Sequence, residues 1–383
     1  MRFRHERIDS DPPGVKLGFC LTTDLTGNGR DDVIIGSRGR SYKGRRLVKQ
    51  IENSSIPTFD DVRHRFGLAE VNLFWYENPG WKRHKMSSVS RLDVGASLGD
   101  INGNGRMDVI AGQGIHNNDV YWFEQPKDPR TEWQEHLVTD DFEKYHDLAV
   151  GDVDDDGQSE LVGLSQESEV LFYYDIPDDP YESPWPAENR HIVADGLNTE
   201  GVQIVDIDGD GQTEIIAGTS IFHQPTEPDQ SWQREDITTV LDDVRVAVAD
   251  LDQDGELEVV FSEGDLPEYG SHLGRVAWFD PPDWEPTFLR EDLFGPHSLQ
   301  IADFTGDGRQ DVYVGEMALE SNDDPKHFIF VNQGGGEFEE HVIDHGIPTH
   351  EAKVTDLTGN GRPDIVGKSY GPDHHVDAWY NEG

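Results

Sequence analysis

The sequence predicts an all-β fold, a seven-bladed β-propeller in which every blade has four strands. Three observations support this prediction: a repeated acidic turn, four short β-strands around each copy, and terminal segments that complement each other. The turn reads Asp, any residue, Asp/Asn/Thr, any, Asp/Asn, Gly, any two, Asp/Glu, and an apolar strand follows it. Its copies begin at Asp24, Asp100, Asp152, Asp206, Asp250, Asp303 and Asp356. The usual spacing of about 53 residues is that of a repeat protein.

Four short strands are expected around each turn. In the sixth repeat, residues 297–303 lead into the turn and residues 311–315 leave it. Residues 327–332 and 338–343 then read as the third and fourth strands, separated by a run of glycines. Four strands at this period, without helical periodicity, are typical of propeller blades rather than of a sandwich.

The two ends of the chain predict how the ring closes. Residues 3–8 read as a fourth strand but precede the first turn, and the seventh repeat ends at residues 377–381, which read as a third strand. The N-terminal strand should therefore complete the last blade and pair an edge that would otherwise be exposed. Residues 1–383 are then one propeller, with residues 38–68 as an insertion in the first blade.

Composition excludes several classes of protein. Nine Trp, 17 Phe and 11 Tyr are too many large apolar groups for a disordered acidic chain. The single Cys excludes an intrachain disulfide framework, and no apolar stretch approaches the roughly 18 residues of a membrane span. A net charge of −46 argues against nucleic-acid binding, because such a surface repels phosphates.

The acidity has two possible explanations. One is a functional anionic surface, and the other is adaptation to a cytoplasm at molar salt, where screening suppresses the repulsion between carboxylates. The charges are spread along the whole chain, which favours the second explanation. Because residues 1–6 show no export signal, we expect a cytoplasmic protein of a halophilic organism.

The acidic turns have the composition of calcium-binding loops. Carboxylates at positions 1, 3, 5 and 9, around a glycine, supply the hard oxygen ligands that Ca²⁺ prefers. Three copies have the full set: Asp152, Asp154, Asp156 and Glu160; Asp206, Asp208, Asp210 and Glu214; and Asp250, Asp252, Asp254 and Glu258. We expect calcium there as a brace for the blades, and weaker binding in the four copies with Asn or Thr. The alternative is a set of metal-free turns in which the side chains cap backbone N–H groups.

The turns give the chain a resemblance to propellers built from FG-GAP or VCBS-type repeats, although the literal Phe-Gly and Gly-Ala-Pro signatures are absent. Segments 296–303, 314–317 and 349–356 are also similar to the propeller of the aldos-2-ulose dehydratase family. The first resemblance implies a repeat propeller, and the second implies sugar chemistry.

The histidines fall into two groups. His5, His84, His136, His191 and His341 share one register of the outer strand and are expected to be structural. Nine others, including His223, are expected in or beside the loops of the face opposite the acidic turns, which we call the loop face. Three of these, His146, His297 and His350, stand six residues before the turns of their blades and should reach the channel mouth.

Further polar groups are expected at this channel mouth, and together they form the candidate catalytic set: His297, His350, His146, Tyr370, Arg245, Lys353, Lys368 and Glu316. Elimination next to a carbonyl or carboxylate needs a base, a cation that stabilises the enolate, and an acid for the leaving oxygen. His297 or His350 could serve as base. Arg245, Lys353 or Lys368 could be the cation, and Tyr370 or His146 the acid; a metal held by histidines and Glu316 is an alternative to the cation.

The insertion in the first blade suggests what the ligand is. Residues 38–65 contain eight basic residues, and a basic segment beside a cationic channel mouth suits a small anionic sugar or oligosaccharide. The sequence therefore favours a carbohydrate lyase or dehydratase. A non-catalytic module that binds a glycan or a protein, and a purely structural propeller, remain alternatives.

Overall fold

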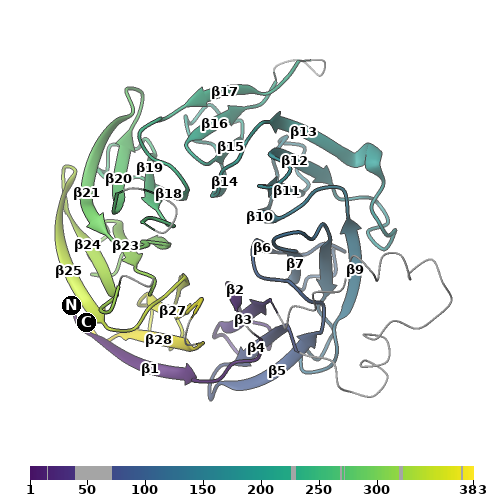
Figure 1. Cartoon of the computed structure of the whole chain (residues 1–383), viewed down its shortest axis with the longest axis horizontal. Helices are drawn as coiled ribbons and strands as arrows, with labels where there is room; N and C mark the ends of the chain where they lie inside the picture. The colour runs from purple at the N-terminus through teal and green to yellow at the C-terminus, as the bar shows by residue number, and fades with distance from the viewer. Residues whose placement is uncertain are drawn as a thin grey trace.

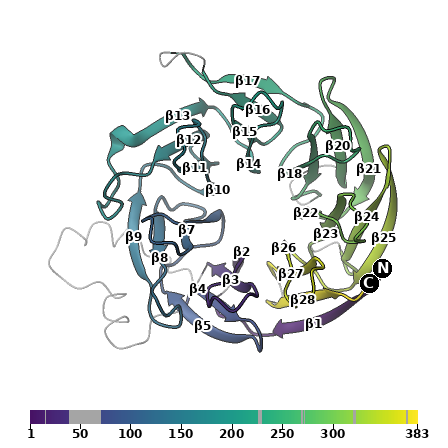
Figure 2. The same cartoon turned by 180° about the vertical axis from the view of Figure 1, so that it is seen from behind.

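The computed structural model describes residues 1–14, 16–38, 71–225, 230–267, 270, 272–318, 322–371 and 374–383. They form seven four-stranded antiparallel sheets arranged around a central channel (Figures 1 and 2). The prediction of a seven-bladed all-β propeller is confirmed. Among the described residues, no helix is long and apolar enough to cross a membrane.

The first strand of each blade lies nearest the channel and the fourth lies outermost (Figure 1). Blades 1 to 4 consist of β2 (Leu17–Thr23), β3 (Asp32–Ser37), β4 (Leu73–Glu77) and β5 (Lys82–Ser87); β6 (Ala96–Gly99), β7 (Asp108–Gly112), β8 (Val120–Glu124) and β9 (Gln134–Thr139); β10 (Tyr145–Gly151), β11 (Glu160–Ser165), β12 (Val170–Asp175) and β13 (Arg190–Asp195); and β14 (Val202–Val205), β15 (Glu214–Ala217), β16 (Ser220–His223) and β17 (Gln233–Asp236). A short 3₁₀ turn, η1 (Ala187–Asn189), precedes β13.

Blades 5 to 7 complete the ring. They consist of β18 (Val244–Ala249), β19 (Glu258–Glu263), β20 (Gly274–Asp280) and β21 (Glu285–Leu293); β22 (Ser298–Ala302), β23 (Asp311–Gly315), β24 (Lys326–Gly334) and β25 (Glu337–His345); and β26 (Glu351–Thr355), β27 (Asp364–Lys368), β28 (Val376–Asn381) and β1 (Phe3–Asp9).

The N-terminal strand closes the last blade, as predicted. β1 pairs antiparallel with β28, from Phe3 opposite Asn381 to Asp9 opposite Val376, and the two chain ends lie side by side in both views (Figures 1 and 2). The carboxylate of Asp377 on β28 bonds His5 Nε2 at 2.6 Å and Arg7 Nε at 2.5 Å. Hydrogen bonds and ion pairs thus join the two ends of the chain.

The hydrophobic core lies between the blades. Trp75 of the first blade packs in one cluster with Phe123 and Trp133 of the second. On the outer strands, His84, His136 and His191 stack on Trp75, Trp122 and Tyr173, with centroids 4.6, 4.3 and 4.6 Å apart. The shared register of these outer histidines therefore has a packing cause, as the sequence suggested.

The acidic turns are braced by their last carboxylate. Asp32 Oδ2 accepts the backbone N–H of Leu25 at 3.0 Å, and Glu160 Oε2 accepts that of Val153 at 2.8 Å. The same contact recurs from Leu251 to Glu258. Position 9 is thus a structural acceptor in the turn as well as a potential ligand.

Most of the basic insertion lies outside the described residues, including Arg40, Lys43, Arg45, Arg46, Lys49, Arg63 and Arg65. Its first member is described: Arg38 Nε lies 3.0 Å from Asp93 Oδ2, beside the channel. The described ends of this segment, Ser37 on β3 and Leu73 on β4, place the insertion between the second and third strands of the first blade.

Candidate functional site

A cavity of about 1010 Å³ occupies the channel at the loop face. It is lined by the first strands of the blades and the loops that enter them, among them the segments around His146, Arg245, His297 and His350. The lining includes eight Asp or Glu side chains but only four Lys or Arg side chains, so the expectation of a uniformly cationic mouth is wrong for the described residues.

Two histidines from adjacent blades form the centre of the basic side. His297 directly precedes β22 and His350 directly precedes β26, and their rings stack with centroids 3.8 Å apart and planes 23° from parallel. Tyr370, which lies just after β27, stacks on the ring of His350, with centroids 4.5 Å apart. Lys16 Nζ lies 4.1 Å from the centre of the Tyr370 ring. The structure thus brings His297, His350 and Tyr370 into contact at the wall of the cavity.

Hydrogen bonds set the orientation of His297. Its Nδ1 lies 2.5 Å from the backbone carbonyl of His350, which can only accept, so Nδ1 carries the proton. Its Nε2 then accepts from Arg245 Nη2 at 2.6 Å. Burial, and next the charge of Arg245, hold the pKa of His297 well below its usual range. The lone pair of His297 is already used, so His350 is the better candidate for a base.

His350 is held by a buried lysine. Lys368 Nζ lies 2.5 Å from His350 Nδ1 and 2.9 Å from the carbonyl oxygen of Leu17. Burial lowers the pKa of Lys368 to about 7, and burial together with His297 and Lys368 lowers the pKa of His350 well below its usual range. The neutral amine of Lys368 can accept a hydrogen bond from Nδ1–H of His350. The proton of His350 then stays on Nδ1, and the lone pair of Nε2 is available. Lys368 is buried and does not line the cavity, so it acts as a positioning residue for His350.

Lys353 is the cation of β26 that lines the cavity. Its Nζ lies 3.0 Å from Glu351 Oε1, and the other oxygen of Glu351 accepts the backbone N–H of Cys20 at 3.1 Å. Burial would lower the pKa of Lys353, but Glu351 outweighs it and raises that pKa. Lys353 is therefore charged at neutral pH, with 31% of its side chain exposed for a ligand.

The acidic side of the cavity surrounds His146 on β10. Its Nε2 lies 2.8 Å from Glu200 Oε1, and its Nδ1 lies 3.0 Å from Asp147 Oδ2. Burial opposes the charge of His146, but Glu200 and Asp147 outweigh it and raise the pKa to about 9. Glu200 also accepts from Arg245 Nη2 at 2.5 Å. The guanidinium of Arg245 thus occupies the space between Glu200 and His297, where a metal would otherwise be sought.

Two members of this site are absent from the sequence-predicted set, Glu200 and Asp265. Glu200 stands six residues before Asp206, in the register that supplied His146, His297 and His350. Applying that register to every residue type, rather than to histidine alone, would have found it. Asp265 lies in the loop after β19, where no register applies.

Glu316 does not take the place predicted for it. Its carboxylate accepts the backbone N–H groups of Phe294 at 2.8 Å and Lys326 at 2.9 Å, and it does not line the cavity. The carboxylate ties two loops of blade 6 together, because buried carboxylates need donors. A metal shared by the histidines and Glu316 is therefore inconsistent with the structure.

The three fully acidic turns differ in how many carboxylates they bring together. Asp250, Asp252, Asp254 and Glu258 offer oxygens within 4.8 Å of one another, and so do Asp152, Asp154 and Glu160. In the remaining turn, Asp208 and Glu214 are joined by His223. The position-5 carboxylates Asp156, Asp210 and Asp254 each accept the backbone N–H of the residue two places later, at 2.8 Å.

The first aspartate distinguishes two of these turns, those of Asp152 and Asp206, from the diluted ones. In the sixth turn, Asp303 Oδ1 accepts from Gly306 and Asp303 Oδ2 accepts from Gly308, so both oxygens are satisfied. Both oxygens of Asp24, Asp100 and Asp356 are satisfied in the same way. By contrast, Asp152 Oδ1 and Asp206 Oδ1 are buried without a hydrogen-bond partner among the described residues. The last carboxylate has such an oxygen in turns of both kinds, Glu258 Oε1 in a fully acidic turn and Asp364 Oδ2 in a diluted one.

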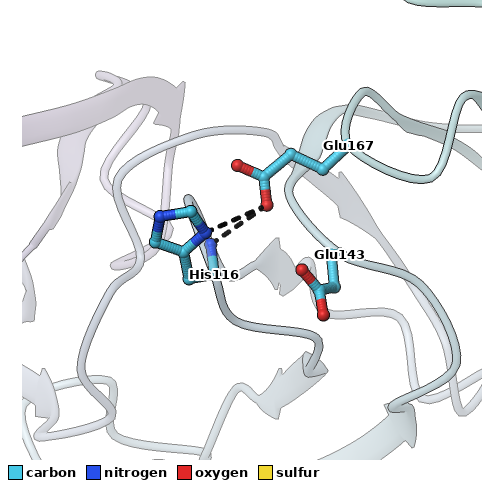
Figure 3. A group of neighbouring side chains, drawn as sticks. All are labelled: His116, Glu143 and Glu167. Carbon is cyan, nitrogen blue, oxygen red and sulfur yellow. Dashed lines mark hydrogen bonds and ion pairs between the residues drawn. The ribbon is translucent and has the colours of Figure 1, made fainter.

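Two other histidine positions complete the comparison with the sequence. His223 ends β16 beside Glu214, at the face of the acidic turns, so its predicted place on the loop face is wrong. At the loop face, Figure 3 shows His116, Glu143 and Glu167 close together on three loops. The His116 side chain is 83% exposed, and exposed groups of this kind are common without an ion, so they do not by themselves indicate a metal site.

The comparison with known families agrees with this geometry. A model of the FG-GAP-like repeat matches residues 100–163, which contain the second and third acidic turns, and residues 303–367, which contain the sixth and seventh. The chain carries FG-GAP-like repeats. No curated protein gives a significant match to it. The FG-GAP match concerns the repeats and their acidic turns. What the cavity can bind has to be argued from the residues that line it.

Proposed function

We propose that this FG-GAP-repeat propeller binds an anionic carbohydrate in the cavity and catalyses an elimination, as a lyase or dehydratase does. The observation that carries the proposal is the stack of His297 and His350, two uncharged imidazoles in a water-accessible cavity whose lining also includes the cations Arg245 and Lys353. An uncharged imidazole next to a fixed positive charge is what proton abstraction beside a carboxylate requires.

The residues on the basic side take separate roles. His350 Nε2 removes the proton from the carbon next to the substrate carboxylate. Lys368 fixes the tautomer of His350 by accepting a hydrogen bond from Nδ1–H. Lys353, charged and part-exposed, holds the carboxylate and stabilises the negative charge that develops on it. Tyr370 and Lys16 close the far side of the stack. The surrounding carboxylates provide acceptors for sugar hydroxyls.

Binding tests the first half of the proposal. Calorimetric titration in concentrated KCl compares D-glucuronate, D-galacturonate and D-gluconate with uncharged D-glucose. At least one sugar acid should bind more tightly than glucose, and Lys353→Met should remove that preference. The matched control is Lys82→Met, on the outer strand β5, where the side chain is exposed and far from the cavity. Equal binding of glucose and all three acids would contradict an anion-selective site.

We also propose calcium in the three fully acidic turns. In two of these turns the support is the unpartnered buried oxygen of the first aspartate, Asp152 or Asp206, because the first aspartates of the diluted copies have both oxygens satisfied. In the third turn the support is the convergence of four carboxylates, from Asp250, Asp252, Asp254 and Glu258, within 4.8 Å. Hard carboxylate oxygens of this kind suit Ca²⁺. The ion would neutralise the crowded carboxylates and brace the turn between the first and second strands. This role is structural, because these turns lie on the face away from the cavity.

A further inference from the structure

We propose that Asp265 is the proton donor of this site, the group that protonates the oxygen leaving the sugar. This inference rests on the proposed elimination and adds a catalytic residue that neither the repeat motif nor the register of the inner strands identifies. Asp265 lines the cavity from the loop after β19, on the acidic side next to His297.

Asp265 differs in its contacts from three other carboxylates of the cavity, Glu200, Asp147 and Glu351. Glu200 accepts from Arg245, Asp147 accepts the backbone N–H of Gly201, and Glu351 pairs with Lys353. The carboxyl of Asp265 has no hydrogen bond among the described residues, and its nearest basic atom is His297 Nε2 at 3.9 Å. A partly buried carboxyl without donors is more stable when it carries a proton.

The charges that face Asp265 act in the same direction. Burial is the main cause that raises its pKa to about 6, and the charge of Glu200 adds to it. Arg245 and His146 lower the pKa, whereas Asp243 raises it further. A carboxyl with a pKa near the working pH can both give and regain a proton, which is the requirement for a general acid.

The position of Asp265 complements that of His350. Asp265 lies at the edge of His297, and His350 lies against the face of the same ring, 3.8 Å away between centroids. The donor and the base are thus separated by one imidazole, a span that adjacent carbons of one sugar ring can bridge. The acidic and basic sides of the cavity would then act on neighbouring atoms of the substrate.

The step balances on a simple probe, 4-O-methyl-D-glucuronate. His350 Nε2 takes the proton from C5, and the electron pair of that bond passes through the carboxylate-stabilised carbanion to form the C4–C5 double bond. The bond between C4 and its oxygen breaks, and the oxygen leaves with its electron pair. It takes the proton of Asp265, so the products are methanol and an unsaturated uronate.

The test separates proton abstraction from departure of the leaving group. In D₂O, NMR follows exchange of the C5 hydrogen, while near-ultraviolet absorbance follows the unsaturated product. Asp265→Asn should lower elimination about 100-fold or more, the scale of a lost general acid, while C5 exchange persists. His350→Gln should abolish both. Asp242→Asn is the matched control, because this nearby carboxylate is exposed and outside the cavity lining, and it should leave both rates unchanged.

A second substrate and the pH profile make the result specific. The 4-O-(4-nitrophenyl) analogue releases a phenolate that needs no proton, so Asp265→Asn should eliminate it at nearly the wild-type rate. Wild-type elimination of the methyl ether should decline as pH rises above about 6, and this decline should vanish in the variant. Asp265→Glu should restore part of the activity, which a folding defect would not explain.

The failures are distinguishable. If the wild type neither exchanges C5 nor eliminates either probe, the proposed elimination is wrong, and the role of Asp265 falls with it. Two results with an active wild type would overturn only this inference. In the first, Asp265→Asn eliminates the methyl ether as fast as the wild type. In the second, its elimination rates for the methyl and the nitrophenyl ether fall equally, so that Asp265 is not the proton donor.

Discussion

The imidazole of His297 lies on the imidazole of His350, with centroids 3.8 Å apart, although the two residues belong to different blades. The backbone carbonyl of His350 also accepts the Nδ1 proton of His297. Stacking and hydrogen bonding therefore join blades 6 and 7 at the wall of the cavity. The pair contributes to packing as well as to the candidate site, so experiments on it must separate stability from function.

Replacing His350 should affect elimination and stability to different extents. His350→Gln removes the stack and the contact with Lys368, and we expect a loss of about 1–3 kcal/mol of unfolding free energy, the usual cost of leaving a buried polar group unpaired. Elimination should be abolished at the same time, because the base is gone. His84→Gln is the control, because His84 stacks on Trp75 in an outer strand: it should lower stability and leave elimination intact. Denaturant unfolding and the elimination assay measure the two effects, and retained elimination in His350→Gln would contradict the assignment.

Removing calcium should destabilise the propeller through the fully acidic turns. At a free calcium concentration 100 times the dissociation constant, each bound ion adds about 2.7 kcal/mol to the stability of the folded state. A chelator should therefore lower the melting temperature of the wild type. Asp252→Asn should reduce this effect, whereas Asp307→Asn, in a diluted turn, should respond like the wild type. A melting temperature that ignores excess chelator would count against calcium in these turns.

The net charge predicts a dependence on salt. Repulsion among 77 acidic side chains, opposed by 31 basic ones, is screened over about 3 Å at 1 M salt but over about 30 Å at 0.01 M. We expect the folded signal in circular dichroism to be lost as KCl is lowered from 3 M to 0.05 M. Equal stability at both concentrations would refute the halophilic origin inferred from composition.

Asp377 should control closure of the ring. Its buried carboxylate pairs with His5 and Arg7 of the N-terminal strand and with His375, and Asp377→Asn should cost about 3–5 kcal/mol, as expected for a broken buried pair. The control, Glu382→Gln, removes an ion pair with Arg2 whose arginine is 78% exposed, and should change stability by less than about 1 kcal/mol. Denaturant unfolding compares the two variants.

The same carboxylate predicts a pH dependence. Burial would raise the pKa of Asp377, but His375, His5 and Arg7 outweigh it and lower the pKa to about 2. Because the folded-state value is below the unfolded one, near 4, this contribution is present above pH 4 and is lost as pH falls towards 2. Wild type and Asp377→Asn should therefore converge in stability over that range. A constant difference between them down to pH 2 would contradict the assignment.

The sequence alone was sufficient for the architecture. The acidic turn is a local pattern, and the hydrogen bond that it specifies is made within the turn, as in the bond from Leu25 to Asp32. The pairing of β1 with β28 joins the two ends of the chain, and it followed from the count of strands, since a third strand without a fourth leaves an unpaired edge. The register of the inner strands also brought His146, His297 and His350 to one cavity, because equivalent positions of equivalent blades lie at the same height.

Only the tertiary structure decided which of these groups touch, and in which state of charge. Glu316 directly follows β23 and Lys368 ends β27, yet Glu316 binds backbone N–H groups while Lys368 reaches His350, because the neighbouring loops supply different partners. Asp265 obeys no register, since its place depends on the path of a loop. The pKa values depend on burial and on charges from several blades, as with His146 between Asp147 and Glu200. The residues that meet across the channel are far apart in the chain. A pattern that repeats along the sequence therefore does not predict which of them touch.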